Sequence, residues 1–455
     1  MPRGDFPAWQ WERMPMLPYL LNAVYLGLLL FASPWIAWRA VSQGKYRQGL
    51  ATRFLGTVPV RRSRRKCLWF HAVSVGEVTL IGPLLRRMAE RHPEWECVVS
   101  TTTRAGMALA RRRYPELASF YCPLDFTWAA RAAMRRVRPD ALVLVELELW
   151  PNLMIAAKAH GARVAVINGR LGDSSFRGYC RIRPLLRPLL RNLDLVAAQN
   201  ACYAQRFVQL GARPEIVHVT GSMKFDGAEM DRSNPATSRL RELAGLQPGD
   251  IVFLAGSTQE PEEQAALAAF SALRDRWPNL RLILVPRHPE RFDAVARLLE
   301  CSGLAWQRRS RLESEGPRPE ARILLVDTVG ELGAWWGTAA IAFVGGSLGS
   351  RGGQNMMEPA AYGAAVCFGP NTWNFRDIVT AMLQCQAAAV VPDASALADF
   401  VRRCLEEPEY AASLGRQAQR LVASQLGATQ RTLELLEPLV ECPNGGAQPA
   451  NVFAA

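Results

Sequence analysis

The segment WFHAVSVGEV, residues 69–78, brings polar side chains to the point where an apolar run meets an amphipathic stretch. These polar residues are His71, Ser74 and Glu77, with Gly76 directly before the carboxylate. The dipole of a helix stabilises a charged carboxylate in its first turn, and an ionised carboxylate can act as a general base. The same pattern is also ordinary helix-start chemistry, so the local sequence leaves both interpretations open. His71 by itself is interpreted as a core histidine.

Two more carboxylates, Glu146 and Glu148, follow an apolar run that begins at residue 141. On a strand they would face the same side of the sheet, because successive side chains alternate. Two carboxylates on one face cost free energy unless they are paired or exposed, so ion pairs with nearby arginine are the alternative to a chemical role. Lys224, in the segment GSMKFD, lies at the end of this half of the chain.

The second half of the chain carries residue types that bind phosphate and sugar. Arg287 directly follows an apolar run, and a guanidinium can donate two hydrogen bonds to one phosphate. Small donors precede predicted helices at 256–263 and 329–336, as in anion sites. In the glycine-rich segment 344–363, Asn355 and Glu358 fall on one helical face and suit a pair of sugar hydroxyls. The sequence GxxxxGKS does not occur, which excludes a P-loop ATPase.

Short apolar runs alternate with amphipathic stretches and predict parallel β-sheets built from βαβ units. In the first half we expect strands at 67–73, 97–103, 141–148, 163–169 and 193–199. A polar segment, 226–240, reads as a linker, and a second series of strands follows at 251–257, 281–287, 321–327, 339–347, 364–370 and 388–393. Two Rossmann-like halves should face a cleft, with ligands at the carboxyl ends of the strands.

The N-terminal run 19–38 carries no charged residue and is long enough to span a bilayer core of roughly 30 Å. Arginine and lysine are dense after it, between 39 and 66, so we expect the rest of the chain on the cytoplasmic side. Asn22, Ser33 and Pro34 interrupt the run, so a helix lying on the membrane surface is the alternative to one crossing it. Either arrangement is a membrane anchor.

Composition sets wide limits on function. The 455 residues are 49% hydrophobic and 21% charged, which suits two globular domains. The net charge of +13 favours an anionic partner, namely nucleic acid, an acidic membrane surface or a phosphorylated substrate. The ten cysteines are scattered without a CxxC pair, which argues against a disulfide framework or a zinc site.

Taken in order, the motifs resemble one enzyme family. That family is the 3-deoxy-D-manno-octulosonic acid (Kdo) transferases of lipopolysaccharide synthesis. The motifs that are similar to those of this family are SVGE, ELELWPNL, NGRLGDSSFRGY, GSMKFD, GST, PRHPERF, GELGAWW and GGQNMMEP. The resemblance runs from about residue 18 to residue 430. It implies an α/β fold of the GT-B type with four parts: an N-terminal membrane anchor (17–40), an acceptor-binding domain (45–230), a CMP-Kdo-binding domain (240–430) and a C-terminal tail (431–455).

The resemblance also implies the reaction and its residues. Kdo would pass from CMP-Kdo to a hydroxyl of a lipid A precursor, lipid IVA, with inversion and without a required metal or other cofactor. The enzyme would work at the cytoplasmic face of the inner membrane of a Gram-negative bacterium. Glu77 would be the base, supported by Glu146 and Lys224. The implied CMP-binding residues are Pro286, Arg287, Gly330, Glu331, Leu332, Asn355 and Glu358.

Two positions depart from the family pattern. Gln259 stands where histidine is expected in GSTHE, and Gly172 stands where serine is usual in GRLSD. Neither change removes a charged catalytic group, so they leave details of acceptor binding open.

Two other functions fit parts of the pattern. Another GT-B transferase would use a UDP- or GDP-sugar in place of CMP-Kdo. A basic scaffold that binds nucleic acid would need exposed aromatic residues between its arginines, whereas the arginines here mostly punctuate amphipathic helices.

Overall fold

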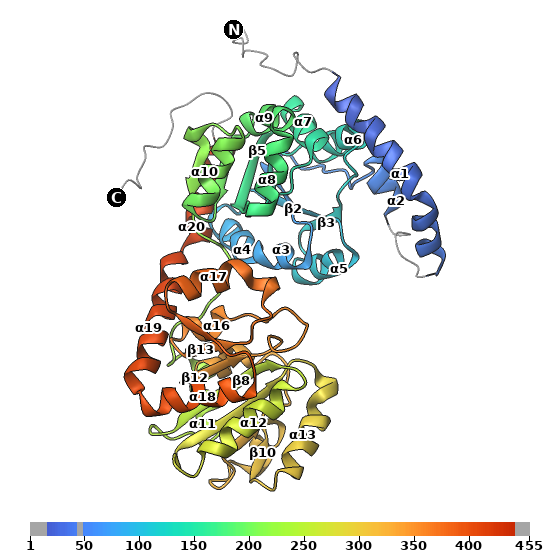
Figure 1. Cartoon of the computed structure of the whole chain (residues 1–455). Helices are drawn as coiled ribbons and strands as arrows, with labels where there is room; N and C mark the ends of the chain where they lie inside the picture. Colours follow the sequence, from blue (N-terminus) through green and yellow to red (C-terminus); the bar gives the residue numbers. More distant parts are fainter. Residues whose placement is uncertain (1–15, 43–48, 442–455) are drawn as a thin grey trace. The chain divides into compact units, whose positions relative to one another are not determined.

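A computed structural model describes residues 16–42 and 49–441 of the chain. These residues form two compact units (Figure 1). Unit 1 contains the described residues up to Asp226 together with those from Leu426 onward, and unit 2 is Gly227–Gln425. The polypeptide therefore leaves unit 1 for unit 2 and later returns to it.

Unit 1 is built on a parallel sheet of seven strands in the order β3-β2-β1-β4-β5-β6-β7. This is the Rossmann order extended by one strand, and it changes direction between β1 and β4. The strands are β1 Cys67–His71, β2 Glu96–Thr101, β3 Ala118–Tyr121, β4 Ala141–Val145, β5 Arg163–Gly169, β6 Leu195–Ala198 and β7 Val217–Val219.

Helices cover both faces of this sheet, as the crossover connections of a parallel sheet require. They are α1 Leu17–Ser42, α2 Leu50–Leu55, α3 Val75–Leu80, α4 Gly82–Arg91, α5 Arg104–Arg113, α6 Thr127–Val137, α7 Pro151–Ala159, α8 Asp173–Arg181, α9 Arg183–Arg191, α10 Ala201–Leu210 and α20 Ala428–Glu441.

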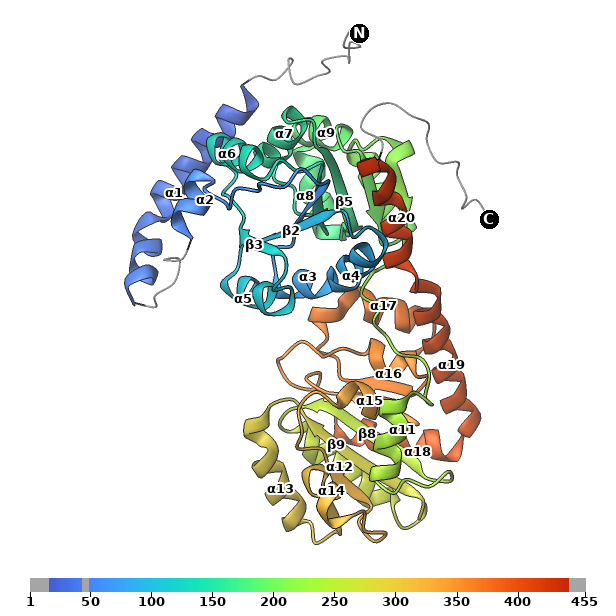
Figure 2. The ribbon, with the colours of Figure 1, turned by 180° about the vertical axis from the view of Figure 1, so that it is seen from behind.

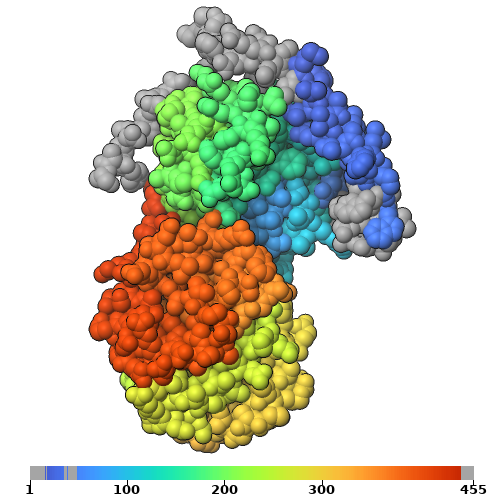
Figure 3. All heavy atoms as spheres, viewed as in Figure 1, coloured from blue at the N-terminus to red at the C-terminus, as the bar shows by residue number. Residues whose placement is uncertain are grey.

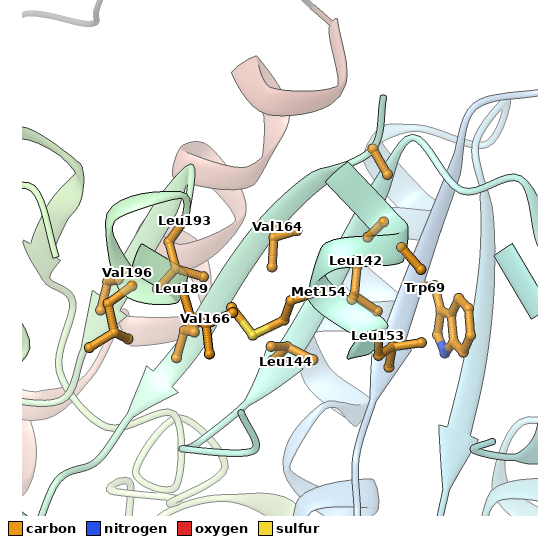
Figure 4. Packing of buried hydrophobic residues seen from close by; sticks show 14 of the residues in the cluster. Trp69, Leu142, Leu144, Leu153, Met154, Val164, Val166, Leu189, Leu193 and Val196 are labelled. Atoms are coloured by element: carbon orange, nitrogen blue, oxygen red, sulfur yellow. The ribbon is translucent and has the colours of Figure 1, made fainter. Parts of the chain in front are cut away.

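The strands of unit 1 are apolar on both sides because each face is covered. On one face Trp69, Leu142 and Val166 pack against Met154 of α7 and Leu189 of α9 (Figure 4). On the other face α20 completes the core: Leu433 and Leu436 join a cluster with Leu68, Phe70 and Val143. A C-terminal tail was expected to begin at residue 431, but residues 431–441 belong to helix α20, so that prediction is wrong for them. Residues 442–455 lie outside the described residues.

Unit 2 repeats the architecture with the strand order β10-β11-β9-β8-β12-β13-β14, all parallel. Its change of direction lies between β8 and β12. The strands are β8 Ile251–Thr258, β9 Leu280–Pro286, β10 Trp306–Arg308, β11 Ile323–Leu325, β12 Ile341–Val344, β13 Ala365–Phe368 and β14 Ala388–Val390.

The helices of unit 2 lie on both sides of this sheet (Figure 2). They are α11 Pro235–Leu243, α12 Glu262–Leu273, α13 Phe292–Cys301, α14 Leu312–Glu315, α15 Leu332–Trp336, α16 Met357–Ala361, α17 Arg376–Gln384, α18 Ala394–Glu406 and α19 Pro408–Gln425. Helix α11 begins within the expected linker 226–240, because Asn234 caps it and Pro235 occupies its first turn.

Helix α1 lies along the surface of unit 1 (Figure 3). Its inner face is docked by polar contacts: the Asn22 amide donates to Thr127 Oγ1 at 2.8 Å, and the Tyr25 hydroxyl donates to Asp125 at 3.2 Å. Its outer face is apolar and open, with Leu20 and Phe31 60% and 90% exposed. Within residues 16–42 and 49–441, no helix combines the length and apolar composition needed to cross a membrane.

Candidate active site

The first cluster of candidate residues forms where β1 passes into α3. Ser74 is the N-cap of α3, and its Oγ both accepts from the Glu77 backbone N–H at 3.3 Å and donates to the Glu77 carboxylate at 2.7 Å. The other carboxylate oxygen accepts from the Val73 backbone N–H at 2.8 Å. This arrangement closely resembles a capping box, so Glu77 does contribute to the helix start.

The environment of Glu77 also suits a base. The residue is only 9% exposed, and burial raises the pKa of its carboxyl. The hydrogen bonds from Ser74 and Val73 oppose that rise, whereas the negative charges of Glu146 and Glu148 add to it. A raised pKa brings a carboxylate closer to the proton affinity that general base catalysis near neutral pH requires. The expected stabilisation of the charged form by the helix dipole is therefore outweighed.

The sequence predicted that Glu146 and Glu148 lie on a strand, but in the structure they follow it. Strand β4 ends at Val145, and Glu146 adopts a left-handed backbone with φ of 61°. Its backbone N–H still donates to Ile167 of β5 at 2.9 Å, which holds the turn against the sheet. Burial raises the pKa of Glu148, whose carboxylate accepts from the Trp150 indole N–H at 3.2 Å.

Lys224 reaches this cluster from the last segment of the first half. Its ammonium lies 2.9 Å from the Glu146 carboxylate. The segment is fixed by Asn168 at the end of β5, whose side-chain oxygen accepts from the Met223 backbone N–H at 3.0 Å. The structure thus brings Glu77, Glu146 and Lys224 together at the switch point of the unit 1 sheet, where open α/β sheets bind ligands.

His71 is a core residue, as expected from the sequence. It is fully buried, its Nδ1 lies 2.9 Å from Ser100 Oγ, and its ring packs edge-on against Trp150 at 5.4 Å between centroids. Burial lowers the pKa of His71 to about 4, so the ring is neutral at physiological pH.

In unit 2 a second cluster forms around Arg287, Asn355 and Glu358. The Asn355 amide donates to the Glu358 carboxylate at 2.9 Å. Burial raises the pKa of Glu358, while the Asn355 hydrogen bond and the positive charge of Arg287 oppose the rise. Arg287 directly follows Pro286, the last residue of β9, and its backbone N–H donates to Thr258 of β8 at 3.0 Å.

Glu331 makes a different set of contacts. Arg309 donates to its carboxylate from Nε at 2.9 Å and from Nη2 at 2.7 Å, and Thr328 Oγ1 donates at 2.7 Å. Burial alone would raise the pKa of Glu331, but these hydrogen bonds outweigh it and hold the pKa below its usual value. Gly330 has φ of 97°, which permits the turn into α15 at Leu332.

The glycine-rich turn after β12 already holds an anion, and that anion belongs to the protein. The buried carboxylate of Glu262 accepts from the backbone N–H groups of Gly346, Ser347 and Leu348 at 2.7–2.9 Å, and from that of Gln259 at 2.9 Å. A Cβ at Gly345 would lie 2.7 Å from this carboxylate, so glycine is required there. One backbone N–H group of the anion site predicted at 256–263, that of Gln259, is therefore already occupied by Glu262.

Comparison with known proteins fits this geometry. A sequence model of the family described as 3-deoxy-D-manno-octulosonic-acid transferase (kdotransferase) matches residues 48–227. The 3-deoxy-D-manno-octulosonic acid transferase of Haemophilus influenzae is 32% identical over 92% of this chain and 98% of its own length. The transferase of the same name from Bordetella pertussis is 36% identical over 81% of this chain and 86% of its own length.

This chain belongs to the Kdo transferase family. It is therefore a glycosyltransferase. Among solved structures, the UDP-GlcNAc 2-epimerase of Neisseria meningitidis has a TM-score of 0.55 at 13% identity, covering 82% of this chain and 99% of that one. That similarity concerns the fold alone. Two α/β units with parallel sheets are the part of the expected GT-B architecture that is confirmed.

Sequence reasoning missed two residues that shape the sites of this Kdo transferase, Arg309 and Glu262. Arg309 lies among several arginines in RRSR, so nothing local distinguishes it. Glu262 had a signal, because an acidic residue in a segment otherwise rich in anion donors suggests an internal partner. In the described part of the chain, no three His, Cys, Asp or Glu side chains are grouped to hold a metal ion.

Proposed function

We propose that this Kdo transferase moves Kdo from CMP-Kdo to a hydroxyl of the lipid A precursor lipid IVA during lipopolysaccharide synthesis, with inversion. The observation that carries the proposal is the buried Glu77 carboxylate, with its raised pKa, beside the Glu146–Lys224 pair. A base in that environment takes a proton from a sugar hydroxyl more readily than an exposed glutamate does. Family membership supplies the sugar that is transferred.

In the proposed step Glu77 accepts the proton of the acceptor hydroxyl. The hydroxyl oxygen forms a bond to the anomeric carbon of Kdo, and the bond from that carbon to the CMP phosphate oxygen breaks. CMP leaves with the electron pair and gains negative charge. A Cβ at Gly76 would meet only Ser74 Oγ, at 3.8 Å, so the backbone before Glu77 leaves room for an acceptor.

Cationic groups would stabilise the leaving phosphate. Arg287 is suited to bind it, since a guanidinium is a fixed fork of donors. We assign Asn355 and Glu358 to sugar hydroxyls of the nucleotide, and Gly330, Glu331 and Leu332 to the same donor site with Pro286. Lys224, 2.9 Å from Glu146, would supply positive charge near the reacting atoms. No metal ion or other cofactor is part of the proposed mechanism.

The acceptor is a membrane lipid, and the outer face of α1 supports delivery from a membrane. We infer that α1 lies on the cytoplasmic surface of the inner membrane, with its exposed side chains such as Leu20 and Phe31 in the lipid. The polar contacts of Asn22 and Tyr25 hold the opposite face on unit 1. The net charge of +13 favours an anionic lipid surface.

The test is direct. Purified protein is incubated with a tetra-acylated, bisphosphorylated lipid A precursor and freshly generated CMP-Kdo, with and without EDTA, and the lipid product is weighed by mass spectrometry. We expect the precursor to gain whole Kdo units at the same rate with EDTA. Absence of product from folded protein with active donor would overturn the proposed reaction, and a rate lost in EDTA would overturn metal independence.

A further inference from the structure

Unit 1 contains a cavity of about 580 Å³ between α1 and the carboxyl edge of the sheet. One wall is the inner face of α1, with Leu28, Leu29 and Ala32. The opposite wall is formed by residues 124–126 before α6, by residues 147–150 with Pro151 at the start of α7, and by Tyr179 of α8. This volume lies within the range of roughly 300–1,000 Å³ that is typical of sites for small ligands. We call it the α1 cavity.

The lining of the α1 cavity disfavours an anionic ligand. Its described lining residues include no lysine, arginine or histidine, but two carboxylates, Asp125 and Glu148. Asp125 is already bound by the backbone N–H groups of Asn152 and Leu153, at 3.1 and 2.9 Å, and by the Tyr25 hydroxyl. A phosphate would meet negative charge without a compensating cation. The remaining surface is largely leucine, phenylalanine, proline and alanine, which suits a hydrocarbon.

The position of the α1 cavity connects the proposed membrane surface to the proposed site of reaction. At one side it includes Leu28, a side chain of α1 that is 61% exposed. At the other side it includes Glu148, two residues after Glu146, the partner of Lys224. An apolar chain entering beside Leu28 would therefore reach the loop that carries Glu146, one of the catalytic candidates.

We propose that the α1 cavity holds one acyl chain of the acceptor lipid while the acceptor hydroxyl lies at Glu77. This inference rests on the proposed function, because it assumes a lipid acceptor. It goes beyond membrane attachment by α1: the outer face of the helix contacts the bilayer, whereas its inner face contacts a chain withdrawn from it. The cavity then selects acceptors by chain length.

A pair of neighbouring substitutions tests the cavity. Ala32→Phe adds a ring to the cavity wall, and Ser33→Phe adds the same ring at the next residue, which is exposed. Leu124→Trp fills the cavity from the opposite wall, so the test does not depend on α1 alone. Each folded variant is assayed in detergent micelles with the tetra-acylated precursor and with analogues whose acyl chains are shortened stepwise.

For the wild type we expect kcat/KM to fall about fourfold for each methylene removed from the bound chain. Ala32→Phe and Leu124→Trp should lower kcat/KM for the full-length acceptor at least tenfold. Their value should then equal that of the wild type with the analogue whose acyl chains are shortest. Ser33→Phe should match the wild type with every acceptor. A wild-type kcat/KM independent of chain length, or cavity variants equal to Ser33→Phe, would overturn the inference.

Equilibrium binding of the precursor without donor separates this inference from the proposed reaction. Binding that is weakened in Ala32→Phe but not in Ser33→Phe, in a protein that transfers no Kdo, would overturn the reaction and support the cavity. Kdo transfer by the wild type, with equal precursor binding by Ala32→Phe and Ser33→Phe, would support the reaction and overturn the cavity.

Discussion

Glu77 has a structural role and a proposed catalytic role, and both depend on the same carboxylate. With Ser74 it completes the start of α3, and in the proposed reaction it takes a proton from the acceptor. Glutamine can replace glutamate in a capping box, because its side-chain oxygen still accepts a hydrogen bond, but it cannot serve as a base. The two functions are therefore separable by substitution.

Glu77→Gln should lower kcat by about 10²–10⁴-fold while the melting temperature stays close to that of the wild type. Glu77→Ala should lose activity as well and also lose about 1 kcal/mol of stability, because the helix start is damaged. Product formation by mass spectrometry and thermal unfolding measure the two effects. A Glu77→Gln enzyme with wild-type kcat would show that another group is the base.

The pH dependence of kcat/KM should reveal how the residues around Glu77 shift its pKa. A base must be deprotonated, so activity rises as pH increases through its pKa, and the negative charge of Glu148 raises that pKa. Glu148→Gln should therefore move the acidic limb of the kcat/KM profile to lower pH. The exposed Glu90→Gln is the control and should leave the limb in place. A limb unmoved in Glu148→Gln would contradict the assignment of that limb to Glu77.

For single residues, the sequence predicted which side chains are candidates for the site, but it did not predict their contacts or pKa shifts. The motif resemblance named Glu77, Glu146 and Lys224, and their catalytic roles remain predictions. The ion pair between Glu146 and Lys224 joins positions far apart in the chain, so no local pattern contained it. The direction of the Glu77 pKa shift was likewise hidden, because it depends on burial and on charges brought in by another loop.

Among the elements, the glycine-rich turn of unit 2 depends on one carboxylate. Glu262→Gln replaces an acceptor oxygen with a donor, so some of the backbone N–H groups it serves lose their partner. We expect a loss of about 2–3 kcal/mol in the free energy of unfolding, measured by urea denaturation. Glu260→Gln, which removes only an exposed ion pair with Arg291, should cost less than about 1 kcal/mol. Equal losses would contradict the role of Glu262.

Helix α1 should determine membrane binding through its outer face. Replacing Leu20, Val24 and Phe31 together with serine removes apolar surface that vesicles would bury, so flotation with phospholipid vesicles should fall at least about tenfold. Serine at Val329, Leu383 and Val390, exposed apolar residues of unit 2, is the matched control and should leave flotation unchanged. Equal flotation of both triple variants would contradict membrane binding by α1.

The strands that sequence reasoning missed share a position. β3, β7 and β10 each lie at the edge of a sheet and have only three or four residues. A central strand such as β4 is apolar throughout because both its faces are buried, whereas an edge strand is short and half exposed. Periodicity therefore detected the central strands and, among the edge strands, β14, but it overlooked these three.

For the whole molecule, the repeated βα rhythm predicted two halves, and the structure has two units of the same design. The return of the chain to unit 1 was not predicted. An amphipathic helix carries no sign in its own sequence of which sheet it covers, and α20 follows directly after α19 of unit 2.

If unit 2 binds the donor as proposed, its nucleotide should stabilise the protein selectively. CMP at about 100 times its Kd should raise the free energy of unfolding by about 2.7 kcal/mol, seen as a higher melting temperature, and UDP at the same concentration should not. Arg287→Ala should abolish this protection, while Arg297→Ala, an exposed arginine on α13, should retain it. Protection by UDP equal to that by CMP would favour a transferase that uses a UDP-sugar.

The position of α20 has a consequence for synthesis on the ribosome. Leu433 and Leu436 complete the cover on one face of the unit 1 sheet, yet they are translated only after all of unit 2. Unit 2 can therefore fold while unit 1 is still incomplete. A chain that terminates directly after α19 would carry a complete unit 2 and a partly uncovered apolar face on the unit 1 sheet, which chaperones and proteases recognise.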